Sequence, residues 1–200
     1  MGRIAAILLA ALLAFGCGSK NRIDKLDANA TLLAFGDSLT FGSGAGPTES
    51  YPAVLERSIG RKVVNAGVPG ETSAQGLERL PATLDEVKPQ LLLLCHGGND
   101  FLRRLDDAQA ASNVRAMIGL ARERGIPVVL IGTPKPGLPP SVPAFYGEIA
   151  TQMKVPYDDA VLRSVLLDNG LKSDMVHPNA AGYAKIAAAV EKMLKGSGAI

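Results

Sequence analysis

Three residues from two distant parts of the chain have the side chains that acyl transfer by serine requires. Ser38 follows an apolar run that ends in Gly36-Asp37, so a short buried strand delivers its hydroxyl to the end of a sheet. His177 lies in a loop before the last expected helix, and Asp174 precedes it by three residues. An Asp at this spacing can accept from the imidazole Nδ1–H and leave Nε2 to take the serine proton. We therefore expect Ser38, His177 and Asp174 to act as nucleophile, base and orienting acid.

Each of these residues also has a simpler structural interpretation. Asp37 and Ser38 are favoured helix N-cap residues, and a loop histidine next to a helix start is often only solvent-exposed. The chain has two histidines, so the base is either His177 or His96. The joint occurrence of a serine, a base and an acid at loop positions favours catalysis over separate structural roles.

Donors for a developing oxyanion follow other expected strands. The backbone N–H groups of Ser38 and Gly70 and the side-chain amide of Asn99 each lie just past a strand end. A glycine allows close backbone approach, and an uncharged amide donates without a proton equilibrium. Taken singly, Gly70 and Asn99 are ordinary turn residues. Together at one sheet edge, these three residues predict an oxyanion hole.

Strands and helices alternate along the chain. We expect strands at 32–35, 62–65, 90–95, 126–131 and 155–157, and helices at 51–59, 73–87, 107–124, 142–153 and 179–194. The second of these helices should be broken or kinked at Pro81, and the proline-rich stretch 133–143 should cross the molecule irregularly. This order predicts right-handed βαβ crossovers and a sheet of about five parallel strands with helices on both faces.

The first 17 residues differ in character from the rest. An early cation, the apolar run 4–15 and small residues at its end are typical of a secretory signal. Cys17 resembles the acylated cysteine of a bacterial lipoprotein, although Ala14 and Phe15 depart from the usual pattern before it. We expect an exported protein that is either released into the periplasm or anchored to a membrane through Cys17. The expected organisation is a linker at 18–29, one domain at 30–195 and a tail at 196–200.

Composition excludes several classes of partner. The formal net charge is only +2 and aromatic residues make up 4% of the chain, so neither a basic stripe nor a base-stacking surface for nucleic acid is expected. Of the two cysteines, Cys95 ends an apolar run and should be a buried hydrophobic residue rather than part of a disulfide framework. The glycine-rich loop 41–47 matches no phosphate-binding motif. We expect no metal, because no residue cluster has metal-ligand spacing, and no other cofactor.

Four separated blocks carry a family resemblance. They are 36–39 (Gly-Asp-Ser-Leu), 65–73 around Gly70, 97–100 (Gly-Gly-Asn-Asp) and 174–177 (Asp to His). In order and spacing these blocks resemble the SGNH (GDSL) hydrolase family, and most of all its bacterial periplasmic thioesterase, arylesterase and lysophospholipase branch. The resemblance implies a flavodoxin-like α/β/α sandwich with strand order 2-1-3-4-5 and the catalytic and oxyanion roles assigned above. His96 departs from the pattern, because that branch often has an acidic residue there.

The expected function is ester hydrolysis through an acyl-enzyme on Ser38. Aryl or alkyl esters, acyl thioesters and lysophospholipids are the expected substrates, with Phe101, Leu102 and the 134–143 crossing as walls for the acyl chain. A carbohydrate O-deacetylase or acetyltransferase of the same fold is the alternative. A non-catalytic lipoprotein that binds lipids or glycans stays open, whereas the missing phosphate motif disfavours a nucleotide- or flavin-binding protein. The oligomeric state is not predictable from these residues.

Overall fold

A five-stranded parallel sheet forms the centre of the molecule. The computed structural model describes residues 21–200, so the expected signal segment and Cys17 lie outside the described residues. The strands run in the order β2-β1-β3-β4-β5, and every pairing is parallel. Their bounds are β1 Leu32–Gly36, β2 Val63–Gly67, β3 Leu91–Cys95, β4 Val128–Ile131 and β5 Tyr157–Asp158. The order 2-1-3-4-5 implied by the family resemblance is thereby confirmed.

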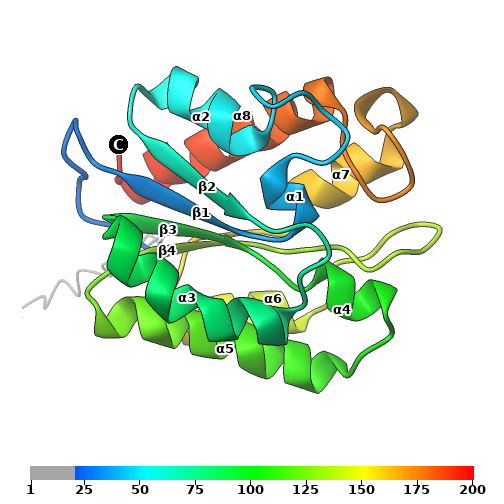
Figure 1. Ribbon diagram of the computed structural model, residues 1–200, viewed down its shortest axis with the longest axis horizontal. Coiled ribbons are helices and arrows are strands. Elements are labelled where there is room, and N and C mark those ends of the chain that lie inside the picture. The colour runs from blue at the N-terminus through cyan, green and yellow to red at the C-terminus, as the bar shows by residue number, and fades with distance from the viewer. Residues whose placement is uncertain (1–20) are drawn as a thin grey trace, which may run out of the picture.

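Helices cover both faces of this sheet and make three layers (Figure 1). One face carries α1 (Ser38–Phe41), α2 (Tyr51–Ile59), α7 (Val161–Leu167) and α8 (Ala180–Ser197). The other carries α3 (Ser73–Val87), α4 (Gly98–Leu102), α5 (Asp107–Glu123) and α6 (Phe145–Gln152). A short 3-10 turn, η1 (Asn169–Leu171), precedes α8. The chain is therefore an α/β sandwich, as predicted.

The central strands are apolar along their whole length because both faces of the sheet are covered. In β1, Leu32 and Ala34 pack in the core under α2 and α8, whereas Leu33 and Phe35 pack in the core under α3 and α5. The continuous leucines of β3 alternate between the same two cores, and Cys95 at its end is buried, as expected. Alternation of side chains between two apolar layers fixes these strands rigidly beneath the loops that follow them.

The helix α3 differs from its expected form. Thr72 and Gln75 form a reciprocal capping box at its start, and the helix then continues without interruption through Pro81. The expected break is therefore wrong, whereas the alternative of a kink at Pro81 stays a prediction. Leu80 and Leu84, which flank the proline, are buried, and their packing against the sheet holds the helix together although Pro81 supplies no backbone donor.

Two further differences concern segments that the sequence placed outside regular structure. The helix α7 was not expected, and its first N–H groups are capped by the Asp158 carboxylate. The N–H groups of Ile23 and Leu26 donate to the carbonyls of Ser197 and Ala199 at 3.0 and 2.8 Å. Parts of the expected linker and tail thus pack together as part of the domain. Within the described part of the chain, no helix combines the length and apolar character needed to cross a membrane.

Candidate active site

Strand register brings the predicted site residues to one edge of the sheet. Gly36 at the end of β1 is paired with Gly67 of β2 and with Cys95 of β3, so these three strands end side by side. The segments that follow them carry Ser38 at the start of α1, Gly70 in the loop after β2, and Asn99 in α4. This edge is where open α/β sheets generally bind their ligands.

The structure brings the three residues of the expected triad together. Ser38 Oγ lies 3.0 Å from His177 Nε2, and His177 Nδ1 lies 2.8 Å from Asp174 Oδ2. The second oxygen of Asp174 accepts from the N–H groups of Val176 and His177, both at 2.8 Å, and so fixes the loop between acid and base. Partial burial acts to raise the Asp174 pKa, but the hydrogen bonds from His177 and the two N–H groups outweigh it and hold the pKa below its ordinary value. Asp174 is therefore a charged acceptor for the imidazole N–H.

A helix cap presents Ser38. The buried Asp37 is the N-cap of α1, and its side chain accepts from the N–H of Leu39 at 3.0 Å. Desolvation raises the pKa of this carboxyl. Gly36 is required before the turn, since a Cβ there would lie 2.0 Å from the carbonyl oxygen of Cys95. The capping interpretation and the catalytic interpretation are thus compatible, because the cap is what orients Ser38.

The expected oxyanion donors occupy neighbouring positions. Ser38 is the first residue of α1, so its N–H has no acceptor within the helix. Asn99 lines a cavity together with Ser38 and His177, and its Nδ2 donates to the carbonyl of Glu71 at 3.0 Å. Gly70 has a φ of +80°, which favours glycine, and its carbonyl accepts from the Arg103 side chain at 2.7 Å. It lies in the loop beside Asn99 but does not line the cavity.

The cavity beside Ser38 has a volume of about 230 Å³ and mainly apolar walls. Its apolar lining is supplied by Leu39, Leu102, Pro134, Pro136, Leu138, Pro140, Leu166, Leu167, Met175 and Val176. The 134–143 crossing therefore forms a wall of the cavity, as the sequence predicted. The walls from α7 and from Met175-Val176 were missed, although two apolar residues between Asp174 and His177 were a visible signal.

Of the two α4 residues expected in the wall, only one lines it. Leu102 faces the cavity and is 48% exposed. Phe101 points the other way into the core, where its ring centroid lies 6.3 Å from that of Phe145 and 6.5 Å from that of Tyr146. Adjacent residues of a helix project about 100° apart, so the two side chains do not share a surface. The assignment of Phe101 as a substrate contact is therefore corrected.

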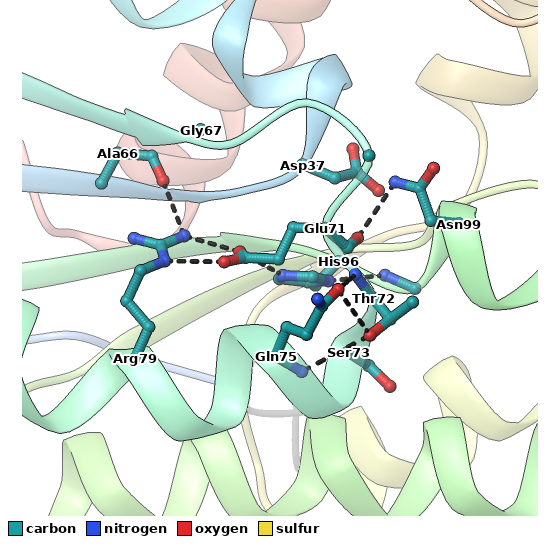
Figure 2. A network of polar contacts seen from close by, with 12 residues as sticks. Asp37, Ala66, Gly67, Glu71, Thr72, Ser73, Gln75, Arg79, His96 and Asn99 are labelled. Atoms are coloured by element: carbon teal, nitrogen blue, oxygen red, sulfur yellow. Dashed lines mark hydrogen bonds and ion pairs between the residues drawn. The ribbon is translucent and has the colours of Figure 1, made fainter.

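A second histidine–carboxylate pair lies close to Asn99 (Figure 2). His96 Nε2 lies 3.0 Å from Glu71 Oε2, and the same carboxylate accepts two hydrogen bonds from Arg79, at 2.8 and 2.7 Å. His96 does not contact Ser38, in agreement with its exclusion from the triad. Within residues 21–200, no group of three or more His, Cys, Asp or Glu side chains could hold a metal ion.

Comparison with known proteins connects this geometry to a family. The model of the GDSL-like lipase/acylhydrolase family matches residues 34–185. The matched region holds Ser38, Gly70, Asn99, Asp174 and His177. The chain belongs to the GDSL-like lipase/acylhydrolase family.

Relatives of this GDSL hydrolase act on esters. The esterase TesA of Pseudomonas aeruginosa is 35% identical over 199 residues, which cover 92% of this chain and 98% of that protein. Thioesterase 1/protease 1/lysophospholipase L1 of Escherichia coli is 31% identical, with 82% and 83% coverage. An arylesterase of Vibrio mimicus is 37% identical over about half of each chain. This GDSL hydrolase is thus a serine ester hydrolase.

Solved structures of the family share its fold. The crystal structure of TesA aligns with a TM-score of 0.75 at 33% identity and covers 84% of this chain and 99% of its own. AlinE4, an esterase of the SGNH hydrolase family, aligns with a TM-score of 0.65 at 31% identity and covers 86% and 98%. The GDSL hydrolase therefore has the sandwich architecture of these esterases over nearly their whole length.

Proposed function

We propose that the GDSL hydrolase cleaves carboxylic esters through an acyl-enzyme on Ser38. The observation that carries this proposal is the continuous contact from Ser38 Oγ through His177 to Asp174, with distances of 3.0 and 2.8 Å. His177 Nε2 takes the hydroxyl proton as Oγ attacks the ester carbonyl. Asp174 stabilises the imidazolium that forms, and His177 then returns the proton to the leaving alcohol or thiol.

The oxyanion of the tetrahedral intermediate is stabilised by donors at the sheet edge. The proposed donors are the N–H groups of Ser38 and Gly70 and the second N–H of Asn99 Nδ2, whose first is donated to Glu71. The carbonyl reforms as the leaving group departs. A water molecule that is deprotonated by His177 then hydrolyses the acyl-enzyme along the same path in reverse.

The proposed substrates carry an apolar acyl chain. The cavity walls beside Ser38 are formed mainly by leucine, proline, valine and methionine side chains, which favour aliphatic or aromatic groups over a sugar ring. Esterases, a thioesterase/lysophospholipase and an arylesterase among the relatives agree with this choice. Alkyl and aryl esters, acyl thioesters and lysophospholipids are therefore proposed ahead of acetylated carbohydrates.

The proposed location is the periplasm or the membrane facing it. The basis is the signal-like sequence of residues 1–17. At the start of the described chain, the Asn21 side chain donates to the carbonyl of Val155, which lies just before β5. A tether at this end would attach at the sheet edge opposite Ser38 and leave the site accessible. Mass analysis of the mature N-terminus would distinguish acylation at Cys17 from cleavage and release.

Covalent labelling and kinetics test the proposal. A fluorophosphonate should label the wild-type protein once per chain, and Ser38→Ala should abolish both the label and ester hydrolysis. The control is Ser164→Ala on α7, whose hydroxyl only donates to the carbonyl of Val161 and which should label normally. Labelling that persists in Ser38→Ala would refute the mechanism. A preference for acetylated sugars over p-nitrophenyl esters of increasing chain length would refute the substrate class.

A further inference from the structure

The amide of Asn99 works as an oxyanion donor only in one of its two orientations. Its nitrogen end donates and its oxygen end accepts, so a rotation by 180° would turn a stabilising contact into a repulsive one. Asn99 Nδ2 lies 3.0 Å from the carbonyl oxygen of Glu71. That oxygen can only accept, and a rotated amide would place two oxygens against each other. The carbonyl of Glu71 therefore selects the orientation in which the nitrogen serves the site.

The position of this carbonyl depends on the side chain of the same residue. The Glu71 carboxylate is 7% exposed and accepts from Arg79 through both oxygens and from His96 at 3.0 Å. Figure 2 shows this carboxylate between Arg79 on one side and His96 on the other, with the carbonyl of Glu71 turned toward Asn99. Three hydrogen bonds on one side chain leave the backbone at Glu71 little freedom to rotate.

Arg79 connects Glu71 to two strands. Its Nη2 also donates to the carbonyl of Ala66 in β2 at 3.1 Å, and its guanidinium lies 4.0 Å from the ring centroid of Phe35 in β1. A planar guanidinium that is both stacked and bidentate is fixed in direction, which a lysine at this position would not be. The loop that carries Gly70 and Glu71 is thereby tied to the edge strand β2 and to its neighbour β1.

His96 connects the same carboxylate to the segment that carries Asn99. The imidazole is fully buried, and its Nδ1 accepts from the N–H of Gly97 at 3.1 Å. The ring proton therefore resides on Nε2, where it is donated to Glu71. The space for this ring depends on Gly76, since a Cβ there would lie 2.2 Å from Nε2. His96 thus holds both sides of the Asn99–Glu71 contact.

We propose that His96 and Arg79 are positioning residues that act through Glu71 to keep the donor end of Asn99 directed at the substrate carbonyl. This proposal rests on the proposed function, in which Asn99 stabilises the oxyanion. Neither His96 nor Arg79 touches the reacting atoms. Their loss lowers the rate of the chemical step without changing how the substrate binds in the apolar cavity.

A double-mutant cycle with Asn99 tests this coupling. In the wild-type background, His96→Leu should lower kcat by about 10- to 100-fold, as misplacing a catalytic group does, with KM nearly unchanged. In the Asn99→Ala background, which itself lowers kcat by about 100-fold, His96→Leu should have almost no further effect. His96→Gln restores a donor toward Glu71 and should recover most of the lost kcat. A merely structural role would give losses that multiply in the two backgrounds.

Controls keep the outcomes distinguishable. Arg124→Gln removes the surface pair between Arg124 and Asp85 and should leave kcat unchanged. If His96→Leu shows no thermal unfolding transition, Glu71→Gln replaces it in the same cycle. If the decreases in kcat caused by His96→Leu and Asn99→Ala multiply in the double variant, the positioning role is overturned but the proposed function stays intact. A full kcat in Asn99→Ala overturns the donor role of Asn99 and this inference with it, whereas labelling of Ser38→Ala overturns the acyl-enzyme mechanism.

Discussion

The two histidines of this protein sit on opposite sides of the same sheet edge and are used in opposite ways. Each lies within 3.0 Å of a carboxylate. His177 meets Asp174 through Nδ1 and presents Nε2 to Ser38, whereas His96 meets Glu71 through Nε2 and has its Nδ1 occupied by the N–H of Gly97. His177 is 23% exposed and His96 is fully buried.

The difference shows that a histidine–carboxylate pair does not by itself make a catalytic base. Whether the histidine can act as a base depends on which ring nitrogen is hydrogen-bonded to the carboxylate and on which group the other nitrogen contacts. His177 faces a hydroxyl that can give up a proton, so its second nitrogen is available for chemistry. Both nitrogens of His96 are hydrogen-bonded to fixed protein groups, so neither is available to a substrate.

Replacement of His177 should have the largest effect on activity. We expect His177→Ala to lower kcat/KM for a p-nitrophenyl ester by about four orders of magnitude, because the serine proton then has no acceptor. The side chain is partly exposed, so the melting temperature should change little. Kinetics and thermal unfolding of one preparation would measure both. Retention of a tenth of the activity would contradict the assignment of His177 as the base.

Asp174→Asn should reduce activity by giving His177 the hydrogen-bonding pattern of His96. The asparagine oxygen can still accept from the N–H groups of Val176 and His177. Its amide nitrogen would donate to Nδ1, so the ring proton would move to Nε2. A protonated Nε2 cannot accept the proton of Ser38. We expect kcat to fall by about 100-fold or more, with less loss than in a fully buried triad because Asp174 is 55% exposed.

The tautomer can be measured directly. In ¹⁵N NMR spectra of the wild-type protein at neutral pH, the imidazole proton of His177 should reside on Nδ1, and in Asp174→Asn it should reside on Nε2. The signal of His96 should not change and serves as an internal reference. A variant with normal kcat and a shifted tautomer would show that proton transfer at His177 does not limit the reaction.

The sequence predicted those segments whose residues all meet the same physical requirement. Burial on both faces forces β1 and β3 to be continuously apolar, so they were predictable within a residue. The contact among Ser38, His177 and Asp174 was predictable because each residue follows a strand or precedes a helix at short, fixed spacing. The helix α7 was missed because its seven residues are too few to show a clear helical period.

The parts of the site that escaped prediction depend on packing between distant segments. Glu71 contacts Arg79 and His96 only because α3 packs against the sheet, and no local sequence pattern predicts that contact. In the same way, Phe101 and Leu102 are neighbours of similar character, and only their packing decides that Leu102 lines the cavity. The unbroken α3 at Pro81 is a third case in which packing overrides a local preference.

Glu71 should stabilise the folded protein above pH 4.5, a contribution that an uncharged replacement lacks. Burial acts to raise its pKa, but hydrogen bonds from Arg79 and His96 prevail and lower the pKa from the ordinary value of 4.5 to about 2. A lowered carboxyl pKa stabilises the folded state fully above pH 4.5, and this contribution is lost as the pH falls toward 2. We expect its size to be on the order of 2 kcal/mol.

Melting temperatures between pH 2 and pH 6 would test this expectation. The wild-type curve should fall steeply below pH 4.5, and Glu71→Gln should start lower and fall less steeply over the same interval. Asp85→Asn is the matched control, because Asp85 pairs with Arg124 on the surface and should change the curve little. Parallel curves for the wild type and Glu71→Gln would show that the carboxylate is not held by its partners.

Two glycine replacements should give the smallest effects on stability and kcat, and they test whether His96 needs the space that Gly76 leaves. Both Gly76 in α3 and Gly119 in α5 are helical, so alanine should gain about 0.5–1 kcal/mol at either position from helix propensity. At Gly119 nothing lies within 4 Å of the added Cβ, and the variant should be stabilised by about 0.5–1 kcal/mol.

At Gly76 the Cβ would lie 2.2 Å from His96 Nε2, and the clash should instead destabilise the variant by about 1–2 kcal/mol net. Denaturant unfolding would measure both changes, and kcat should fall only for Gly76→Ala, because only that clash displaces the imidazole that holds Glu71. Equal stabilisation of both variants would mean that His96 can move aside freely, which is incompatible with a positioning role.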